Sequence, residues 1–134
     1  GGDEINFPQA GLNYGWPVIS YGVTYGDDKI GVGTEAPGYE QPLFYWDPSI
    51  APSGLASYQG DMFPEWKGYL IVGSLKFALV SRLDRDEHGT IRSEERMIEG
   101  AFGRIRDVNV APDGSIWLLT DARNGQIVRL SRAD

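Results

Sequence analysis

The chain repeats one pattern, GYLIVGSLKFALVSRL at residues 68–83 and GSIWLLTDARNGQIVRL at residues 114–130. Both copies read as a strand, a short turn and a second strand, and both end in Arg-Leu. They are offset by 46 residues at their starts and by 47 at their Arg-Leu ends. A period of roughly 40–50 residues with four short strands per unit is typical of β-propeller blades. The repeat therefore predicts propeller blades.

Short strands joined by turns extend through the second half of the chain. The 134 residues include 18 glycines and 8 prolines, which interrupt almost every window long enough for a helix. Turn pairs such as Asp113-Gly114 and Asn124-Gly125 tolerate the positive φ angles that tight hairpins need. We predict strands at residues 69–74, 78–83, 105–110, 115–120 and 126–130, and a further strand at 92–99. The predicted fold class is all-β.

The blade length divides the chain into three predicted segments. Residues 1–54 are loop-rich, residues 55–102 form one full blade, and residues 103–134 form a partial last blade. A propeller needs at least about four blades to close, whereas 134 residues at about 46 each make fewer than three. We therefore expect part of a propeller that pairs with a complementary N-terminal fragment or self-associates. A stable lone monomer is not expected, because a truncated array exposes apolar blade surface.

The composition and net charge of the chain argue against several classes of protein. A content of 41% hydrophobic, 12% aromatic and 23% charged residues is that of a folded globular protein. The net charge of −7 argues against nucleic acid as a partner. No apolar stretch approaches the roughly 18 residues of a membrane span. The absence of cysteine excludes disulfides and thiolate metal sites.

The most suggestive residues are the two arginines of GRIRDV, residues 103–108. Strand alternation predicts Arg104 and Arg106 on one face, with Ile105 and Asp107 on the other. Two guanidiniums on one face repel unless an anion lies between them. Spacing alone favours a solvated face on which each arginine pairs with a nearby carboxylate. The alternative is a bound ligand whose carboxylates or phosphates are held by both arginines.

Other polar and aromatic residues indicate a functional site less strongly than the two arginines do. Lys76 lies in a turn after a predicted strand, where lysine usually serves solubility. The aromatic triplet 44–46 precedes two prolines in a predicted rigid, non-helical loop, and core packing explains such triplets more often than a ligand platform.

Residues 84–95 (DRDEHGTIRSEE) approach the pattern of a calcium-binding loop. His88 replaces an oxygen ligand, however, and Arg92 would place a positive charge beside the ion. A charged hairpin turn is the better interpretation. His88 is also the only histidine of the chain and lies in this polar turn, so we give it no catalytic role.

Several motifs together resemble one family, the soluble quinoprotein glucose/sorbosone dehydrogenases, and in particular the C-terminal part of the aldose sugar dehydrogenases. In chain order these motifs are GGDEIN (1–6), NYGWP (13–17), IAPSG (50–54), GYLIVGSL (68–75) and GRIRDV (103–108). The resemblance implies a six-bladed β-propeller that holds pyrroloquinoline quinone (PQQ) on its axis, with calcium at the quinone edge. It also implies oxidation of the anomeric carbon of an aldose to a lactone by hydride transfer to PQQ, in the periplasm or outside the cell.

The resemblance implies a ligand, PQQ, for the candidate residues. Positions that contact PQQ in the family match Arg104, Arg106 and Lys76. A hydroxyl position of the family matches Ser49, in a loop that is one residue longer here. A tryptophan that flanks the substrate matches Trp46. The family's catalytic histidine and its active-site calcium ligands lie upstream of GGDEIN, so we assign no catalytic and no metal-binding residue to this chain. We expect the chain to be inactive alone.

Two other functions fit an all-β chain of this kind. One is a non-catalytic propeller that serves as a binding module, and the other is a structural fragment without a ligand. A module without a quinone has no reason to retain Lys76 together with Arg104 and Arg106, so their joint presence favours the dehydrogenase.

Overall fold

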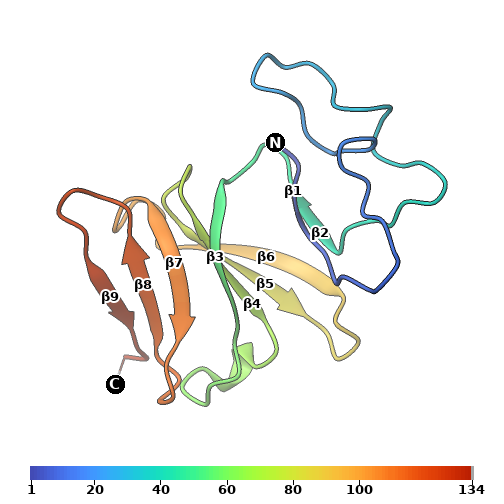
Figure 1. Cartoon of the computed structure of the whole chain (residues 1–134). Coiled ribbons are helices and arrows are strands. Elements are labelled where there is room, and N and C mark those ends of the chain that lie inside the picture. Colours follow the sequence, from blue (N-terminus) through green and yellow to red (C-terminus); the bar gives the residue numbers. More distant parts are fainter. Residues whose placement is uncertain (134) are drawn as a thin grey trace. The chain divides into compact units, whose positions relative to one another are not determined.

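The structure is a computed structural model that describes residues 1–133 (Figure 1). The chain forms two compact units, Gly1–Ile50 and Ala51–Asp134. In the first unit β1 (Asp3–Ile5) pairs antiparallel with β2 (Phe44–Trp46), with Glu4 opposite Tyr45. Loops make up most of the residues between these two strands. The first unit is therefore a two-stranded ribbon that holds long loops.

The second unit contains two antiparallel sheets (Figure 1). The first sheet has the order β3 (Pro52–Ser57), β4 (Leu70–Ser74), β5 (Val80–Arg85) and β6 (Ile91–Met97), with a short 3-10 turn, η1 (Pro64–Trp66), between β3 and β4. The second sheet has the order β7 (Ile105–Val110), β8 (Ile116–Thr120) and β9 (Ile127–Leu130). Each strand pairs with the next along the chain, as in propeller blades.

The predicted all-β fold is confirmed, and most predicted strands end within two residues of the observed ones. The strand predicted from residue 78 begins at Val80, because Ala78 has a φ of 51° in the turn after β4. No strand is predicted at residues 44–46, but these residues form β2. Their partner, β1, lies about forty residues earlier, where no local pattern indicates a pairing. No described helix has the length and apolarity needed to cross a bilayer.

The charged segment 84–95 is a hairpin turn, as predicted. The side chain of Asp86 accepts hydrogen bonds from the amides of His88 (2.9 Å) and Thr90 (2.9 Å), and it pairs with Arg92. Protein donors therefore bind the carboxylate that a calcium loop would offer to the ion.

One hydrophobic core joins the two sheets. Its members are nearly inaccessible to solvent, at 2% exposure or less: Tyr58, Ile71, Val80, Ile105, Val108, Ile116 and Leu118. Two buried or half-buried hydroxyls also connect the sheets. Ser53 Oγ donates to the carbonyl of Ile105 (2.7 Å), and Tyr58 donates to the carbonyl of Gly114 (2.7 Å). These bonds fix both ends of the contact between β3 and the second sheet.

Glycines permit this close approach. A methyl group added at Gly54 would lie 2.5 Å from the Val108 amide nitrogen and 2.7 Å from Asp107 Cα. One added at Gly73 would lie 2.9 Å from Ile105 Cγ2. Strands β3 and β4 can therefore pack against β7 only because these positions carry no side chain.

Gly54→Ala is expected to lower the free energy of unfolding by about 1–3 kcal/mol, because the added methyl group overlaps backbone atoms of β7. Gly26→Ala is the control, since the nearest atom to its methyl group would be 3.6 Å away. That variant should be unchanged or slightly more stable, because alanine restricts the unfolded chain. Urea unfolding of the protein carrying this chain measures the stability of both variants. Equal urea midpoints for Gly54→Ala and Gly26→Ala would contradict the packing argument.

Candidate anion-binding site

Two arginines share one carboxylate at the start of β7. Arg104 donates to Asp121 Oδ2 through Nε (3.1 Å) and Nη2 (2.9 Å). Arg106 Nη2 donates to the same oxygen at 2.9 Å. The arginine side chains remain 53% and 48% exposed. The arrangement that spacing alone favours, an exposed face on which both arginines pair with a nearby carboxylate, is thus observed.

A β-bulge at Arg106 interrupts β7 next to this cluster. Ile105 pairs with Thr120 whereas Asp107 pairs with Leu119, so Arg106 is an extra residue in β7. The predicted alternation therefore fails after Arg106. Ile105 is buried, whereas Asp107, which alternation predicts on the same face as Ile105, is exposed. Simple alternation could not anticipate this, because a bulge re-aims the side chains that follow it.

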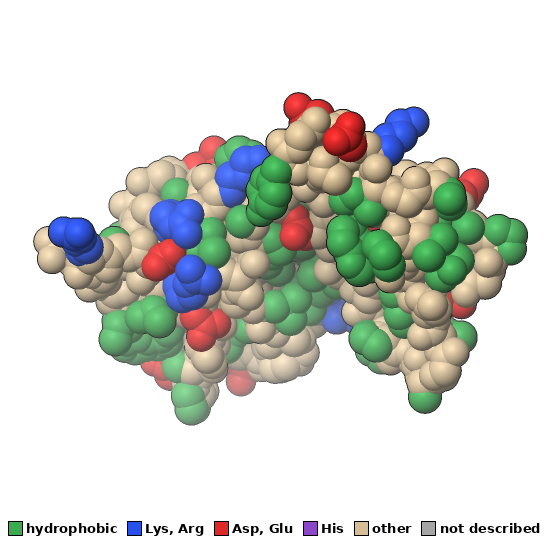
Figure 2. Space-filling view, turned by 45° about the horizontal axis from the view of Figure 1, so that its top comes forward, with side chains coloured by type: hydrophobic (Ala, Val, Ile, Leu, Met, Phe, Trp, Pro, Cys, Tyr) green, Lys and Arg blue, Asp and Glu red, His purple; other side chains and the backbone are tan. Residues whose placement is uncertain are grey.

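The cluster retains positive charge and unused donors. Two guanidiniums face one carboxylate, and together they use only three of their N–H groups in hydrogen bonds. Hydrogen bonds from Arg104 and then from Arg106 hold the pKa of Asp121 below its ordinary value. Asp121 therefore stays ionised and orients both arginines. On the face shown in Figure 2, basic and acidic side chains lie next to one another.

Lys76 lies at the same end of the two sheets as the arginines. It belongs to the turn after β4, and the β3–β4 register places Ser74 opposite Pro52 at the start of β3. The next residue, Ser53, bonds to the carbonyl of Ile105 at the start of β7. Lys76 is exposed, with its Nζ 5.2 Å from the centroid of the Phe77 ring, and it has no ion pair among the described residues.

Trp46 and Ser49 belong to the first unit. Trp46 is 2% exposed and meets the Phe44 ring edge-on at 5.1 Å, which is the packing role that aromatic triplets usually have. Ser49 is half-buried and follows the cis Asp47-Pro48 peptide bond. No group of three or more His, Cys, Asp or Glu side chains within the described residues could hold a metal ion.

A family model described as Glucose / Sorbosone dehydrogenase matches residues 1–129. The chain belongs to this family. It is 42% identical over 135 aligned residues to the aldose sugar dehydrogenase YliI of Escherichia coli strain K12, covering 98% of this chain and 36% of that protein. The chain spans about a third of the length of the curated relatives it matches.

Solved structures of family members have the same fold. A crystal structure of glucose dehydrogenase has a TM-score of 0.94 and 41% identity, over 99% of this chain and 39% of that one. The PQQ-bound aldose sugar dehydrogenase of Streptomyces coelicolor has a TM-score of 0.70 and 25% identity, over 96% of this chain and 36% of that one. The prediction that this chain resembles part of a soluble PQQ-dependent sugar dehydrogenase is confirmed.

Asp121 is the site residue that sequence reasoning missed. A signal was available, because the Asp113-Gly114 turn sets the register of the β7–β8 hairpin, with Val110 opposite Ile116. If this register is continued along both strands away from the turn, Arg104 falls within one residue of the position opposite Asp121. The bulge supplies the remaining shift, and the Asp121 amide then donates to the Arg104 carbonyl at 2.9 Å.

Removing both arginine partners is expected to raise the pKa of Asp121 toward its ordinary value of 3.8. Carboxyl NMR titration of Arg104→Gln combined with Arg106→Gln tests this, with Arg129→Gln as a control that removes a partner of Asp113 instead. Because the folded-state pKa is depressed, ionised Asp121 favours folding above pH 3.8, and this contribution is lost as the pH falls through the depressed value. An Asp121 titration unaffected by loss of both arginines would contradict the assignment.

Proposed function

We propose that the protein carrying this chain oxidises the anomeric carbon of aldoses to lactones with PQQ as its cofactor, and that this chain supplies part of the cofactor site. The observation that carries the proposal is the convergence of the half-exposed Arg104 and Arg106 on Asp121, which leaves other guanidinium donors unused. Membership of the glucose/sorbosone dehydrogenase family and the PQQ-bound relative support the identity of the ligand.

The chemistry of the donor set fits this cofactor. PQQ is a planar tricarboxylate, and planar guanidiniums bind carboxylates through paired hydrogen bonds. The cluster of Arg104, Arg106 and Asp121 has a net positive charge, and Lys76 adds another at the same end of the sheets. Asp121 offsets the repulsion between the two arginines without using all of their donors.

In the proposed mechanism PQQ, when bound, supplies the acceptor for the hydride that leaves the sugar. Arg104, Arg106 and Lys76 bind its anionic groups and stabilise negative charge that develops there. Ser49 adds a hydroxyl contact, and Trp46 flanks the substrate. Guanidinium and ammonium groups carry no acceptor lone pair, so none of the three cations removes the proton of the sugar hydroxyl. We assign the general base and the calcium ligands to parts of the protein outside this chain.

The proposal includes the organisation of the chain. Residues 55–102 act as one full blade and residues 103–134 as a partial last blade, while residues 1–54 form the loop-rich segment. The site then requires a complementary N-terminal propeller segment or a second copy of the chain, and the protein acts in the periplasm or outside the cell. The alternatives, a non-catalytic binding module or a structural fragment, leave the joint presence of Lys76 and the arginine pair without a role.

Arg106→Ala is expected to weaken PQQ binding by ~1.5–3 kcal/mol, roughly 10- to 150-fold, through loss of a charge-assisted hydrogen bond. Arg106→Lys should also lose affinity, because a point charge cannot replace the planar fork. Arg129→Ala is the matched control, since Arg129 is similarly exposed (44%) and also pairs with a carboxylate at 2.9 Å. Fluorescence or calorimetric titration of the protein with PQQ measures all three. Unchanged affinity in Arg106→Ala would refute the site.

The 134-residue chain alone, supplied with PQQ and calcium, is expected to show no aldose oxidation above background. The physical reason is the assignment of base and calcium ligands outside this chain. Dye reduction that depends on both sugar and PQQ is the assay, with a complete family member as the positive control. Turnover by the pure chain would mean that it contains a base that we have not identified.

A further inference from the structure

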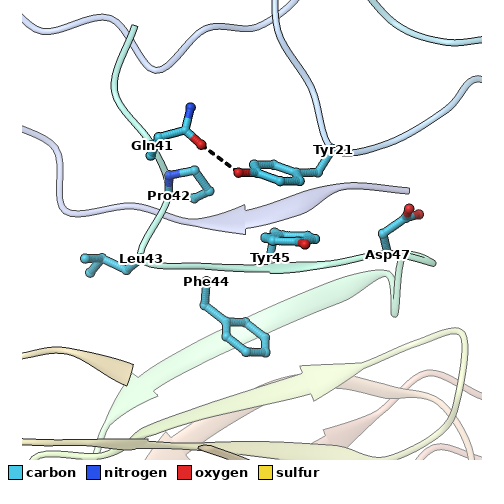
Figure 3. Close-up of a pocket in the computed structure, with 7 residues that line it drawn as sticks. All are labelled: Tyr21, Gln41, Pro42, Leu43, Phe44, Tyr45 and Asp47. Carbon is cyan, nitrogen blue, oxygen red and sulfur yellow. Dashed lines mark hydrogen bonds between the residues drawn. The ribbon is translucent and has the colours of Figure 1, made fainter. Parts of the chain in front are cut away.

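A pocket lined only by residues of the first unit lies within residues 1–50 (Figure 3). Its volume is about 440 Å³, and its lining residues are Tyr21, Gln41, Pro42, Leu43, Phe44, Tyr45 and Asp47. The rings of Tyr21 and Tyr45 stack with centroids 3.8 Å apart and planes 17° apart. Figure 3 shows the Gln41 amide at the hydroxyl end of Tyr21 and the Asp47 carboxylate on the opposite side of the stack. The pocket therefore combines aromatic surface with polar groups at its edges.

This pocket is separate from the residue placed beside the substrate in the proposed function. Tyr45 and Trp46 are consecutive residues of β2, so their side chains point to opposite faces of the strand. Tyr45 is 43% exposed, whereas Trp46 is 2% exposed. A ligand against Tyr45 would thus occupy the face of β2 that Trp46 does not.

Both hydrogen-bond donors and acceptors surround the stacked Tyr21 and Tyr45 rings. Tyr21 donates to Gln41 Oε1 (2.6 Å), and Gln41 Nε2 donates to the Thr34 carbonyl (3.2 Å), which fixes the orientation of the amide. Among the described residues, the Tyr45 hydroxyl and the Asp47 carboxylate have no hydrogen-bond partner. Burial, and then the nearby Tyr45, Glu35 and Glu4, raise the pKa of Tyr21 above its ordinary value. The pocket offers a free hydroxyl, a free carboxylate and an oriented amide.

We propose that this pocket binds one pyranose ring of a neutral carbohydrate, on the face of β2 that Trp46 does not occupy. A sugar ring has an apolar C–H face, which suits an aromatic surface, and hydroxyls that both donate and accept, which suit the mixed polar edge. The volume lies within the roughly 300–1,000 Å³ usual for small-ligand sites. An organic cation needs acceptors and aromatic faces only, so it would leave the hydroxyl and amide donors of the pocket unused.

Methyl β-D-glucopyranoside is the probe, because its anomeric hydroxyl is blocked and it cannot undergo the proposed oxidation. Saturation-transfer NMR and titration with the PQQ-free protein are expected to show binding that shifts the ring resonances of Tyr21 and Tyr45. Tyr45→Ala should weaken binding at least tenfold, and Tyr45→Phe should weaken it less because the ring remains. Tyr25→Ala is the matched control, since Tyr25 is a fully exposed tyrosine of the same unit and lies outside the pocket.

The proposal is overturned if the glycoside does not bind, if it shifts only resonances outside the pocket, or if Tyr45→Ala and Tyr25→Ala bind equally well. Tetramethylammonium binding that depends on Tyr45, in place of glycoside binding, would identify a cation site and also overturn it. Should Tyr45→Ala fail to fold, Asp47→Asn and the resonance shifts of the unmodified protein decide the outcome. None of these variants alters Lys76, Arg104 or Arg106, so failure of the proposed PQQ function would leave this test intact.

Discussion

The close packing of β7 against β3 and β4 is the constraint on which the second unit depends. Gly54 and Gly73 allow the strands to approach to backbone distance, and the Ser53–Ile105 hydrogen bond fixes the start of β7 beside the start of β3. The same contact brings the arginines of β7 to the end of the sheets where Lys76 lies. The packing that stabilises the two sheets therefore also assembles the cationic groups.

Charge is distributed very unequally along this acidic chain. Residues 1–50 contain seven Asp and Glu side chains and a single lysine, whereas residues 51–134 contain twelve acidic and eleven basic side chains. Nearly all of the net charge of −7 thus belongs to the first unit. The arginine cluster lies in the nearly neutral unit, where Asp121 supplies its local counter-charge. A net charge for the whole chain consequently says little about the ligand of this cluster.

The two candidate sites use different physical principles. In the arginine cluster, charge-assisted hydrogen bonds would select an anionic planar ligand, and the half-exposed guanidiniums keep donors available. The pocket at Tyr21 and Tyr45 relies instead on aromatic surface and neutral hydrogen-bonding groups.

The sequence by itself determined strands β4 to β9, their order and the blade repeat, because alternating apolar residues and Asp-Gly or Asn-Gly turns act over a few residues. It also singled out Arg104 and Arg106 through their spacing. Only the tertiary structure decided that Arg106 pairs with Asp121 next to a bulge in β7, that β1 pairs with β2, and that Tyr21 stacks on Tyr45. Each of these contacts joins residues 15 or more positions apart in the chain. Local propensity carries no information about such contacts, because their geometry arises from the packing of whole strands.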